Sequence, residues 1–501
     1  MNLKTLLEPI ETISVEGPLN PEVTGIQYDS RRVEAGNVFV ALRGERTDGH
    51  RFIDHAISQG AVAVVSEQGG PAQARSAFVR VADTVDALAR LSAAFHGHPS
   101  RAMKMVGVTG TNGKTTFTFL LKSILEQHGM KAGLIGTIRY EVGERQIPAD
   151  RTTPQSSDLQ QLLAQMKKGA CKAVVLEVSS HSLVQRRVEE VEFDVAVFTN
   201  LTQDHLDYHK TMEEYFQAKS LLFSGLGKGA KKLTAAVINL DDPRGAGLKK
   251  LLGKGVRCLT YGVSKDADLR PAGIELSLNG SRFVAETPRG KAEISLHLCG
   301  RYNVQNALAA LGAALALDVP METAVRGLGD LASVPGRLEA VRLGQPFHLF
   351  VDYAHTDDAL ENVLSMLKEL VSARLIVVFG CGGNRDTGKR PRMGRVAAQH
   401  ADHAVITSDN PRKEDPALIA RQVEAGFDNA STPSGTGGCT HEIILDREKA
   451  IRRAIELAQP GDIVLIAGKG HETYQEFADT MTPFDDRAVA ANLLKQRTWK
   501  N

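Results

Sequence analysis

The stretch MVGVTGTNGKTT, from Met105 to Thr116, has the composition of a phosphate-binding loop. An apolar strand pattern leads into glycines, and an amphipathic helical pattern follows. Glycines let backbone N–H groups converge on phosphate oxygens, and the start of a helix adds partial positive charge. A lysine here reaches the terminal phosphates, and a hydroxyl can bind Mg²⁺. The stretch predicts an ATP site at Gly110, Thr111, Asn112, Gly113, Lys114, Thr115 and Thr116.

The spacing of the glycines departs from the strict form of this motif. Five residues separate Gly107 from Gly113, where the pattern has four, and counting from Gly110 leaves two. The alternative interpretation is a plain glycine turn before a helix. Because GKTT both follows a strand and opens a helix, the nucleotide site is favoured.

Two further strand ends carry groups that could bind a metal ion beside the phosphates. AVVLEVSSH brings Glu177, and VAVFTNLTQDHLDYH brings Asp204, His205 and His209. Such ligands can hold a second divalent cation, which neutralises charge as two anions approach each other. We prefer His205 to His209, with a capping or core histidine as the alternative. The expected metal ligands are therefore Thr115, Glu177 and His205.

The elements that must position these groups alternate between strands and helices. From about residue 101 to 336 the strand candidates are KAGLIGTI, KAVVLEVSS, FDVAVFTNL and TAAVINLDD. Their alternation with helical patterns predicts a mostly parallel sheet with helices on both faces. From about residue 337, FHLFVDYAH, RLIVVFGCGG, HAVITSDN and DIVLIAGKG repeat the pattern. Each ends in a Gly- or Asp-rich corner, as expected where ligands bind at the carboxyl ends of strands.

A chain of 501 residues is too long for one hydrophobic core. Composition breaks at HGHPS, before the phosphate-binding stretch, and the first segment reads as a small α/β domain. We therefore expect an α/β protein of three domains, at residues 1–99, 100–336 and 337–501. The central one is the P-loop domain and the last is Rossmann-like.

The amino-acid composition indicates which binding partners and which cellular location to expect for the protein. Lys plus Arg (60) nearly equals Asp plus Glu (59), which disfavours nucleic acid and anionic membrane surfaces. The five cysteines form an odd set without CxxC spacing, which favours a reducing compartment over a disulfide framework or structural zinc. The N-terminus lacks a signal-peptide pattern, and no run of apolar residues is long enough to cross a membrane. We expect a cytoplasmic monomer without membrane insertion.

Six motifs in order resemble those of the Mur ligase family: GTNGKTT, EVSSH, NLTQDHLDYH, GRYNVQNALAA, YAHT and GKGHE. They span about residues 107–472, and DSRRVEAGNVFVALRG resembles the muramyl-dipeptide branch of that family. The resemblance implies an amide ligase of peptidoglycan precursor synthesis. ATP phosphorylates a substrate carboxylate, an amine attacks the acyl phosphate, and ADP and phosphate leave. It further implies ATP as co-substrate, two Mg²⁺ ions, and catalytic roles for Lys114, Glu177, His205 and Lys219.

Lys219, in MEEYFQAKSLLF, falls where the family carries N6-carboxylysine. A free ammonium beside two Mg²⁺ ions would be unfavourable, whereas a neutral lysine can add CO₂ and become an anion. From the residue alone, an exposed helix lysine would be the commoner outcome. The resemblance reverses that preference.

The resemblance assigns the N-terminal domain to a UDP-N-acetylmuramoyl dipeptide. Hydroxyls and an arginine can bind its pyrophosphate and carboxylates without a strongly basic protein. For Ser30 and Thr153, a helix cap or surface donor is an equal alternative. The implied residues are Tyr28, Ser30, Glu45, Arg46, Thr47, Thr152, Thr153, Ser179, Gln185 and Arg187.

The resemblance assigns the C-terminal domain to the amino acid, and diaminopimelate-adding members of the family carry the DNPR found in ITSDNPRKEDP. meso-Diaminopimelate differs from lysine by one distal carboxylate, which the fork of Arg412 fits. A salt bridge from Arg412 to Glu414 or Asp415 is the alternative. The implied residues are Arg385, Asp409, Asn410, Pro411, Arg412, Gly468 and Glu472.

Other functions stay open at this point. A lysine-adding or folate-glutamylating relative would use the same ATP chemistry, although Arg412 and DSRR disfavour it. An ATP-driven switch or transporter subunit would leave EVSSH, DNPR and GKGHE without a role. An inactive homologue is disfavoured because Lys114, Thr115, Glu177 and His205 are intact. One departure from the family pattern, Asp357 in YAHTDDAL, should keep a helix start because aspartate favours a first turn.

Overall fold

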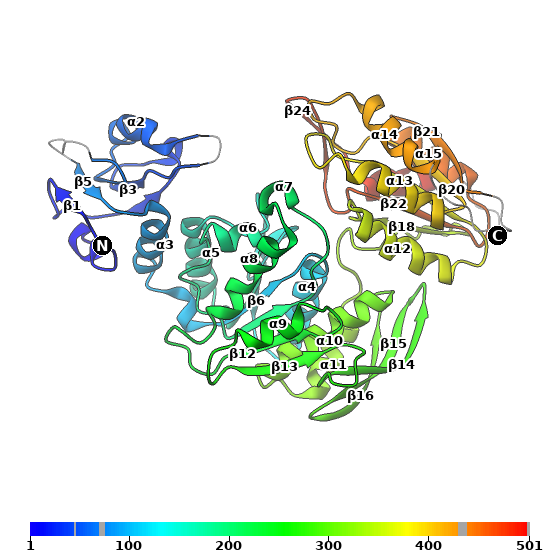
Figure 1. Cartoon of the computed structure of the whole chain (residues 1–501), viewed down its shortest axis with the longest axis horizontal. Helices are drawn as coiled ribbons and strands as arrows, with labels where there is room; N and C mark the ends of the chain where they lie inside the picture. Colours follow the sequence, from blue (N-terminus) through cyan, green and yellow to red (C-terminus); the bar gives the residue numbers. More distant parts are fainter. Residues whose placement is uncertain (45–46, 70–75, 429–437, 498–501) are drawn as a thin grey trace.

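The computed structural model describes residues 1–44, 47–69, 76–428 and 438–497. Figure 1 shows an N-terminal body, a central body and a C-terminal body, with the central one between the other two. Each contains a mostly parallel sheet with helices packed against it. The predicted α/β fold of three domains is confirmed.

The N-terminal domain is built on a five-stranded sheet in the order β1-β5-β4-β3-β2. Only β1 runs antiparallel to its neighbour. Apolar residues of the first and third helices pack on the sheet in one cluster. The strands are β1 (Ser14–Glu16), β2 (Gly25–Gln27), β3 (Asn37–Val40), β4 (Ala63–Ser66) and β5 (Ala77–Arg80). The helices are α1 (Leu3–Leu7), α2 (Ile53–Ser58) and α3 (Thr84–Phe95), with the 3₁₀ turns η1 (Ser30–Arg32), η2 (Gly49–Phe52) and η3 (Pro99–Ala102).

The central domain carries an eight-stranded sheet in the order β13-β12-β11-β6-β10-β7-β8-β9. Its strands are β6 (Lys104–Thr109), β7 (Ala132–Ile135), β8 (Arg139–Val142), β9 (Arg145–Pro148), β10 (Ala173–Glu177), β11 (Val195–Phe198), β12 (Ala235–Asn239) and β13 (Arg257–Tyr261). From β13 to β7 all pairs are parallel, and β8 and β9 add an antiparallel edge. The carboxyl ends of β6, β10 and β11 therefore meet at one edge of the sheet.

Helices cover both faces of this sheet, as the alternating sequence predicts. One buried cluster joins it to α4 (Lys114–Gln127), α10 (Arg301–Ala316) and α11 (Met321–Asp330). A second joins the other face to α5 (Ser156–Lys168), α6 (Ser180–Val184), α8 (Met212–Ser224) and α9 (Gly245–Lys250). The short helix α7 (Leu206–His209) precedes α8. The strand residues are apolar on both sides because both faces are covered.

A three-stranded antiparallel sheet was not predicted. It consists of β14 (Arg270–Ser277), β15 (Gly280–Thr287) and β16 (Gly290–Leu296), and it packs beside α10 and α11. Its strands alternate buried and exposed residues, for example Phe283, Ala285, Ile294 and Leu296 inside. This period of two marks a half-buried sheet. The expectation of strand and helix alternation up to residue 336 was wrong over this segment.

The C-terminal domain has a six-stranded sheet in the order β17-β18-β22-β19-β20-β21, antiparallel only at β17. Its strands are β17 (Glu339–Ala340), β18 (His348–Asp352), β19 (Leu375–Phe379), β20 (His403–Ile406), β21 (Thr440–Ile443) and β22 (Ile463–Ala467). The helices α12 (Asp357–Leu370), α13 (Lys389–His400) and α14 (Pro416–Asp428) cover one face. The helices α15 (Arg447–Leu457) and α16 (Asp486–Lys495) cover the other. A hairpin, β23 (Tyr474–Phe477) and β24 (Thr480–Pro483), follows β22.

In the part of the chain that the structure describes, none of the helices has the length and apolar character needed to cross a bilayer.

Candidate active site

The phosphate-binding loop joins β6 to α4 in the predicted order. Gly110 has φ 152° and Gly113 has φ 85°, both left-handed. A Cβ on Gly110 would lie 1.8 Å from Thr199 Oγ1, and one on Gly113 would lie 2.3 Å from Asn306 Oδ1. Only glycine fits at both positions. The loop therefore leaves the first N–H groups of α4 facing a space that suits an anion.

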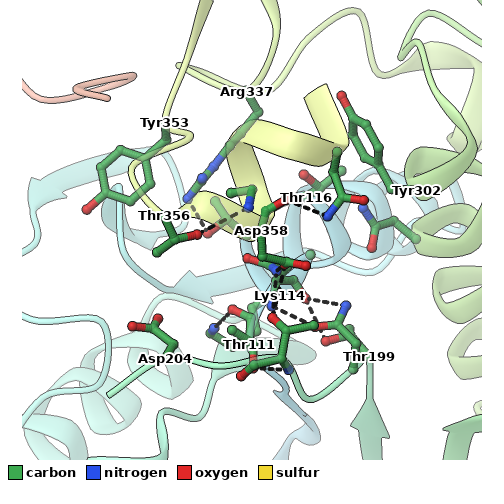
Figure 2. A pocket seen from close by; sticks show the side chains of 18 of the residues that line it. Thr111, Lys114, Thr116, Thr199, Asp204, Tyr302, Arg337, Tyr353, Thr356 and Asp358 are labelled. Atoms are coloured by element: carbon green, nitrogen blue, oxygen red, sulfur yellow. Dashed lines mark hydrogen bonds between the residues drawn. The ribbon is translucent and has the colours of Figure 1, made fainter. Parts of the chain in front are cut away.

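That space is a cavity of about 470 Å³ between the central and C-terminal domains, the size of a small-molecule site. The central domain contributes Thr111–Thr116, Glu177 and His205 to its lining. The C-terminal domain contributes Arg337, Tyr353, Thr356 and Asp358, and Figure 2 shows them around the cavity, with Asp358 directed toward the loop. The predicted nucleotide residues thus lie together at a domain interface.

Lys114 occupies the floor of this cavity. Its Nζ donates to the carbonyl oxygens of Gly110 and Thr111, at 2.9 and 2.8 Å. Burial lowers the pKa of Lys114, while Glu177 and Asp204 favour its charged form. A bound phosphate would place a further anion beside this buried cation.

Glu177 ends β10 and is fully buried, as predicted for a residue that faces the site rather than solvent. It accepts from the backbone N–H and the hydroxyl of Thr137, both at 3.0 Å. Thr137 Oγ1 also lies 3.1 Å from Thr152 Oγ1. Thr137 was not predicted, although its place directly after an apolar strand is the signal that would have found it.

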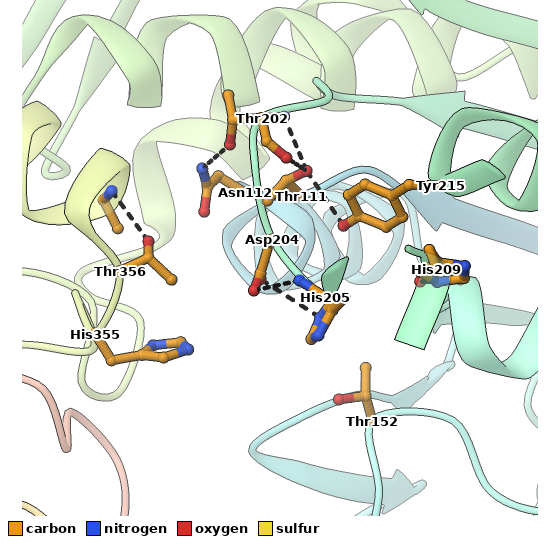
Figure 3. A network of polar contacts seen from close by, with 12 residues as sticks. Thr111, Asn112, Thr152, Thr202, Asp204, His205, His209, Tyr215, His355 and Thr356 are labelled. Atoms are coloured by element: carbon orange, nitrogen blue, oxygen red, sulfur yellow. Dashed lines mark hydrogen bonds and ion pairs between the residues drawn. The ribbon is translucent and has the colours of Figure 1, made fainter. Parts of the chain in front are cut away.

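His205 and His209 take different positions, shown in Figure 3. His205 lines the cavity, has φ 55°, and its Nε2 lies 3.4 Å from Asp204 Oδ2. His209 is buried, with Nε2 2.8 Å from Ser180 Oγ and its ring stacked on Tyr215. The structure therefore places His205, and not His209, at the cavity.

The residues fit Mg²⁺ bound together with a nucleotide. Among the described residues no group of three or more His, Cys, Asp and Glu side chains is arranged to hold a metal ion by itself. Mg²⁺ beside a nucleotide needs only one or two carboxylates, because phosphates and water fill its other positions. The Thr115 hydroxyl and the carboxylates of Glu177 and Asp204 all line the cavity.

Lys219 is buried on α8, with 1% of its surface exposed, so the interpretation as an exposed helix lysine was wrong. Its Nζ donates to the carbonyl oxygen of Gly110 at 2.8 Å and lies 4.4 Å from the Tyr215 ring centre. Burial, followed by the nearby Lys114, lowers the pKa of Lys219 well below its ordinary value. The amine is therefore disposed to be neutral, the form that reacts with CO₂.

Residues of the C-terminal domain that were not predicted close the cavity. Arg337 Nη2 donates to Thr115 Oγ1 at 3.3 Å and its guanidinium lies 4.5 Å from the Tyr353 ring centre. Asp358 accepts from Asn112 Nδ2 at 2.7 Å and from Thr202 Oγ1 at 3.0 Å. These contacts join segments more than 150 positions apart, so only the motif YAHT pointed toward them.

Asp357 lies in the first turn of α12, as expected from its sequence, and Thr356 caps that helix. The Asp357 carboxylate lies 2.5 Å from Arg392 Nε, whereas its neighbour Asp358 faces the nucleotide loop. The departure from the family pattern therefore leaves the helix start in place.

Several residues predicted for the UDP-sugar lie in one group beside Glu177. Thr153 Oγ1 donates to the Glu177 carbonyl at 2.7 Å and accepts from Ser179 N at 3.1 Å. Arg187 is buried and donates to the carbonyl oxygen of Thr153 at 2.9 Å and to Gln185 Oε1. Its Nε has no hydrogen-bond partner among the described residues. Burial lowers the pKa of Arg187 to about 10, with Arg151 adding to the shift. A buried, incompletely paired guanidinium suits an anionic ligand.

The remaining predicted UDP-sugar residues come from the N-terminal domain. Tyr28 Oη donates to Asp158 Oδ2 at 2.8 Å, across the boundary to α5, and burial raises the pKa of Tyr28 to about 12. Ser30 is buried at the start of η1. Thr47 is exposed, and Glu45 and Arg46 lie outside the described residues.

The predicted acceptor residues gather at the carboxyl ends of β19, β20 and β22. Asp409, Asn410 and Pro411 are buried, and a Cβ on Gly468 would lie 2.6 Å from Asp409 Oδ2. Glu472 Oε2 accepts from Asn410 Nδ2 at 2.9 Å and from Lys469 Nζ at 3.0 Å. These two contacts fix a carboxylate at the end of β22.

The two arginines of the acceptor set lie beside this group. Arg412 pairs with Glu476 at 2.8 Å, while Glu414 pairs with Arg390, so the alternative pairing of Arg412 with Glu414 or Asp415 was wrong. Arg385 is exposed after β19, and Gly382 has both Arg412 Nη1 and Arg385 Cγ within 4.0 Å of its Cβ position. None of the seven predicted acceptor residues is among the described residues that line the nucleotide cavity. Tyr353 connects the two regions, since it lines the cavity and its ring centre lies 5.0 Å from that of His471.

Comparisons with known proteins match a single family along nearly the whole chain. Family models match for the Mur ligase middle domain at residues 108–314, the glutamate ligase domain at 336–470 and the Mur ligase family catalytic domain at 22–96. A UDP-N-acetylmuramoyl-L-alanyl-D-glutamate–2,6-diaminopimelate ligase from Geobacillus kaustophilus is 46% identical, covering 99% of this chain and 100% of its own. A protein of the same name from Geobacter sulfurreducens is 44% identical, with 98% of each chain covered.

A solved structure with that ligase name is 34% identical, with a TM-score of 0.70, and covers 99% of this chain and 100% of its own. MurF from Thermotoga maritima in complex with ADP has the same fold at 21% identity, with a TM-score of 0.62 over 94% of this chain and 96% of its own. The fold and the nucleotide loop thus define a P-loop enzyme of the ligase class, built from three α/β domains. The chain belongs to the Mur ligase family.

Proposed function

We propose that this chain is the ATP-dependent ligase that joins meso-2,6-diaminopimelate to UDP-N-acetylmuramoyl-L-alanyl-D-glutamate in peptidoglycan precursor synthesis. The ATP site, the names of the relatives and the order of the motifs support the class of reaction. The observation that carries the choice of amino acid is Arg412. Its side chain is one fifth exposed and pairs with Glu476, and the same DNPR segment carries Asp409 and Asn410, the latter bonded to Glu472.

The reaction requires two anions to approach each other. In the first step a substrate carboxylate oxygen attacks the γ-phosphorus of ATP, and the bond to ADP breaks. Lys114 and the N–H groups at the start of α4 bind the phosphates, and Arg337 adds positive charge from the C-terminal domain. Thr115, Glu177 and His205, with Lys219 as N6-carboxylysine, would hold two Mg²⁺ ions, which neutralise phosphate charge when bound.

In the second step the amine of the amino acid attacks the acyl phosphate, loses a proton, and phosphate leaves. Thr152, Thr153, Ser179 and Arg187 lie where they can hold the dipeptide near Glu177. Positioning of the two reactants accounts for most of the rate in such a reaction. Contact of the C-terminal domain with the nucleotide loop brings the amine toward the activated carboxyl group and excludes water.

The proposed acceptor site contains both positively and negatively charged side chains. Arg412 and Arg385 would bind the distal carboxylate, while Glu472, Asp409 and the backbone at Gly468 would receive the distal ammonium. A lysine substrate would leave Arg412 without that carboxylate, at a cost in binding free energy. Tyr28, Ser30 and Glu45–Thr47 complete the proposed UDP-sugar site from the N-terminal domain.

ADP release in the presence of ATP, the UDP-sugar dipeptide and one amino acid at a time tests this proposal. We expect release with diaminopimelate and little with lysine or glutamate. Release with lysine alone would indicate the lysine-adding relative. Equal release without any amino acid would indicate an ATP-driven switch.

We also propose domains at residues 1–99, 100–336 and 337–501 and a monomer located in the cytoplasm. The use of ATP and the five free cysteines support that location. Limited proteolysis followed by mass spectrometry tests the boundaries, and sedimentation tests the oligomeric state.

A further inference from the structure

Glu476, on β23, contacts the guanidinium that the proposed function assigns to the amino acid. Its Oε2 lies 2.8 Å from Arg412 Nε, and the two side chains are 28% and 20% exposed. The backbones are joined as well, because Arg412 N donates to the Glu476 carbonyl at 3.0 Å and Ala478 N donates to the Arg412 carbonyl at 2.7 Å. The hairpin thus holds one of the protein's own carboxylates at the acceptor site.

The hydrogen-bonding capacity of Arg412 shows what an incoming carboxylate meets. A guanidinium offers two planar edges for a bidentate carboxylate, one formed by Nε and Nη2 and the other by Nη1 and Nη2. Glu476 occupies Nε on the first edge, and Nη1 on the second donates to the Gly383 carbonyl at 2.9 Å. A substrate carboxylate must therefore share Arg412 with Glu476 or displace it.

The charge of Glu476 affects the binding of amino acids that have a distal carboxylate and of amino acids that lack one. It offsets the positive charge of Arg412 and repels a second carboxylate, which weakens binding of a diacidic amino acid. It also keeps Arg412 paired when an amino acid without a distal carboxylate binds, which reduces the penalty for that acceptor. Both effects reduce the selectivity for the diacidic amino acid over an amino acid without a distal carboxylate.

We propose that Glu476 is a specificity-determining residue that acts through Arg412, by competing with the distal carboxylate of the amino acid. This inference rests on the proposed function. It assigns to the β23–β24 hairpin the setting of acceptor affinity and selectivity, while the nucleotide and UDP-sugar sites stay independent of it.

The variant Glu476→Gln tests the inference, because the amide retains the size and an oxygen acceptor for Nε but removes the charge. We expect the KM for diaminopimelate to fall about two- to fivefold, the scale of one partly exposed ion pair. The kcat should change by less than about twofold, since the chemistry of the acyl phosphate is untouched. The ratio of kcat/KM for diaminopimelate over lysine should rise by at least the same factor as the KM falls.

Asp479→Asn provides a matched control on the same hairpin. Asp479 is 86% exposed and pairs with Lys413 at 3.4 Å. This variant should keep the KM and selectivity of the parent protein. Glu476→Ala gives a second test, with a change in the same direction.

An unchanged or raised KM for diaminopimelate in Glu476→Gln would overturn the inference, provided that the thermal midpoint matches that of the parent. The unmodified protein separates this result from failure of the proposed function. If it releases ADP with diaminopimelate while Glu476→Gln shows no gain, only the inference fails. If it does not use diaminopimelate, both fail.

Discussion

Lys219 shows how burial can prepare a side chain for chemical modification. The amine is enclosed by α8 and the nucleotide loop, and burial, followed by the nearby Lys114, lowers its pKa more than Asp204 raises it. We predict that Lys219→Ala abolishes ADP release, because the proposed N6-carboxylysine can no longer form. Short carboxylic acids added to the assay should partly restore release by filling the space.

The exposed Lys228 offers a control on the same domain, since Lys228→Ala should keep full activity. Full activity of Lys219→Ala would eliminate the proposed role of this residue.

His471, next to Glu472, makes stability depend on pH. Burial, followed by Arg337 and Arg487, lowers the pKa of His471 from 6.5 to about 3. Between pH 6.5 and 3 the unfolded chain therefore binds a proton that the folded chain does not, so stability falls as pH decreases. This contribution is about 1.4 kcal/mol per pH unit for one proton.

We predict that in His471→Gln the thermal midpoint decreases less between pH 6.5 and pH 4 than in the parent protein. His55→Gln, at an exposed histidine, should leave that dependence as it was. Scanning calorimetry at several pH values measures both. If the thermal midpoint decreased equally with pH in the parent and in His471→Gln, the imidazole of His471 would not be the group that causes the loss of stability in acid.

At the scale of elements, the turn between β6 and α4 depends on the absence of a side chain at Gly110. A methyl group there would meet Thr199 Oγ1 at 1.8 Å, in addition to the strain of a left-handed φ. We predict that Gly110→Ala weakens ADP binding at least about tenfold, because the loop must move away from β11.

Gly129, at the other end of α4, isolates the steric effect. It also has a left-handed φ, of 76°, but nothing lies within 4 Å of its Cβ position. Gly129→Ala should lower stability slightly and leave ADP affinity within about twofold of the parent value. Calorimetric titration measures the ADP affinity of both variants. Equal losses of ADP affinity in Gly110→Ala and Gly129→Ala would contradict the steric explanation.

The elements that could be predicted are those whose sequence pattern lies within a short stretch of the chain. The strand, glycines and helix of the nucleotide site lie within about twenty residues of each other, and their order sufficed. The β14–β16 sheet was missed because its alternating strands were included in a longer pattern of strands and helices. Arg337 and Asp358 were missed because their partners Thr115 and Asn112 lie more than 200 positions away. The alternative pairing of Arg412 with Glu414 or Asp415 was wrong because its partner, Glu476, comes from a hairpin that the sequence did not predict.

At the scale of the whole molecule, Arg186 links the N-terminal and central domains. Its Nη1 donates to Asp83 Oδ2 at 2.9 Å and its Nη2 to Asp86 Oδ1 at 2.6 Å, both on the first turn of α3 or its cap. Arg186 has φ 52° and stands between Gln185 and Arg187, which belong to the proposed UDP-sugar site. The link therefore orients the proposed UDP-sugar site relative to the N-terminal domain, which is proposed to bind the rest of that substrate.

We predict that Arg186→Ala raises the KM for the UDP-sugar dipeptide about two- to fivefold, because the pair is partly exposed, and leaves the KM for ATP unchanged. Arg90→Ala removes another partner of Asp86 within α3 and should leave both constants unchanged. Steady-state kinetics with each substrate varied in turn provide the comparison. Equal rises for ATP and the UDP-sugar would indicate a general loss of structure.

The most direct measurement is the mass of the UDP-sugar product formed when diaminopimelate and lysine are present together at equal concentration with ATP. The proposed acceptor site, with the guanidinium of Arg412 and the carboxylates of Glu472 and Asp409, predicts that nearly all product carries diaminopimelate. Product carrying lysine in comparable amount, or no adduct with either amino acid, would contradict it.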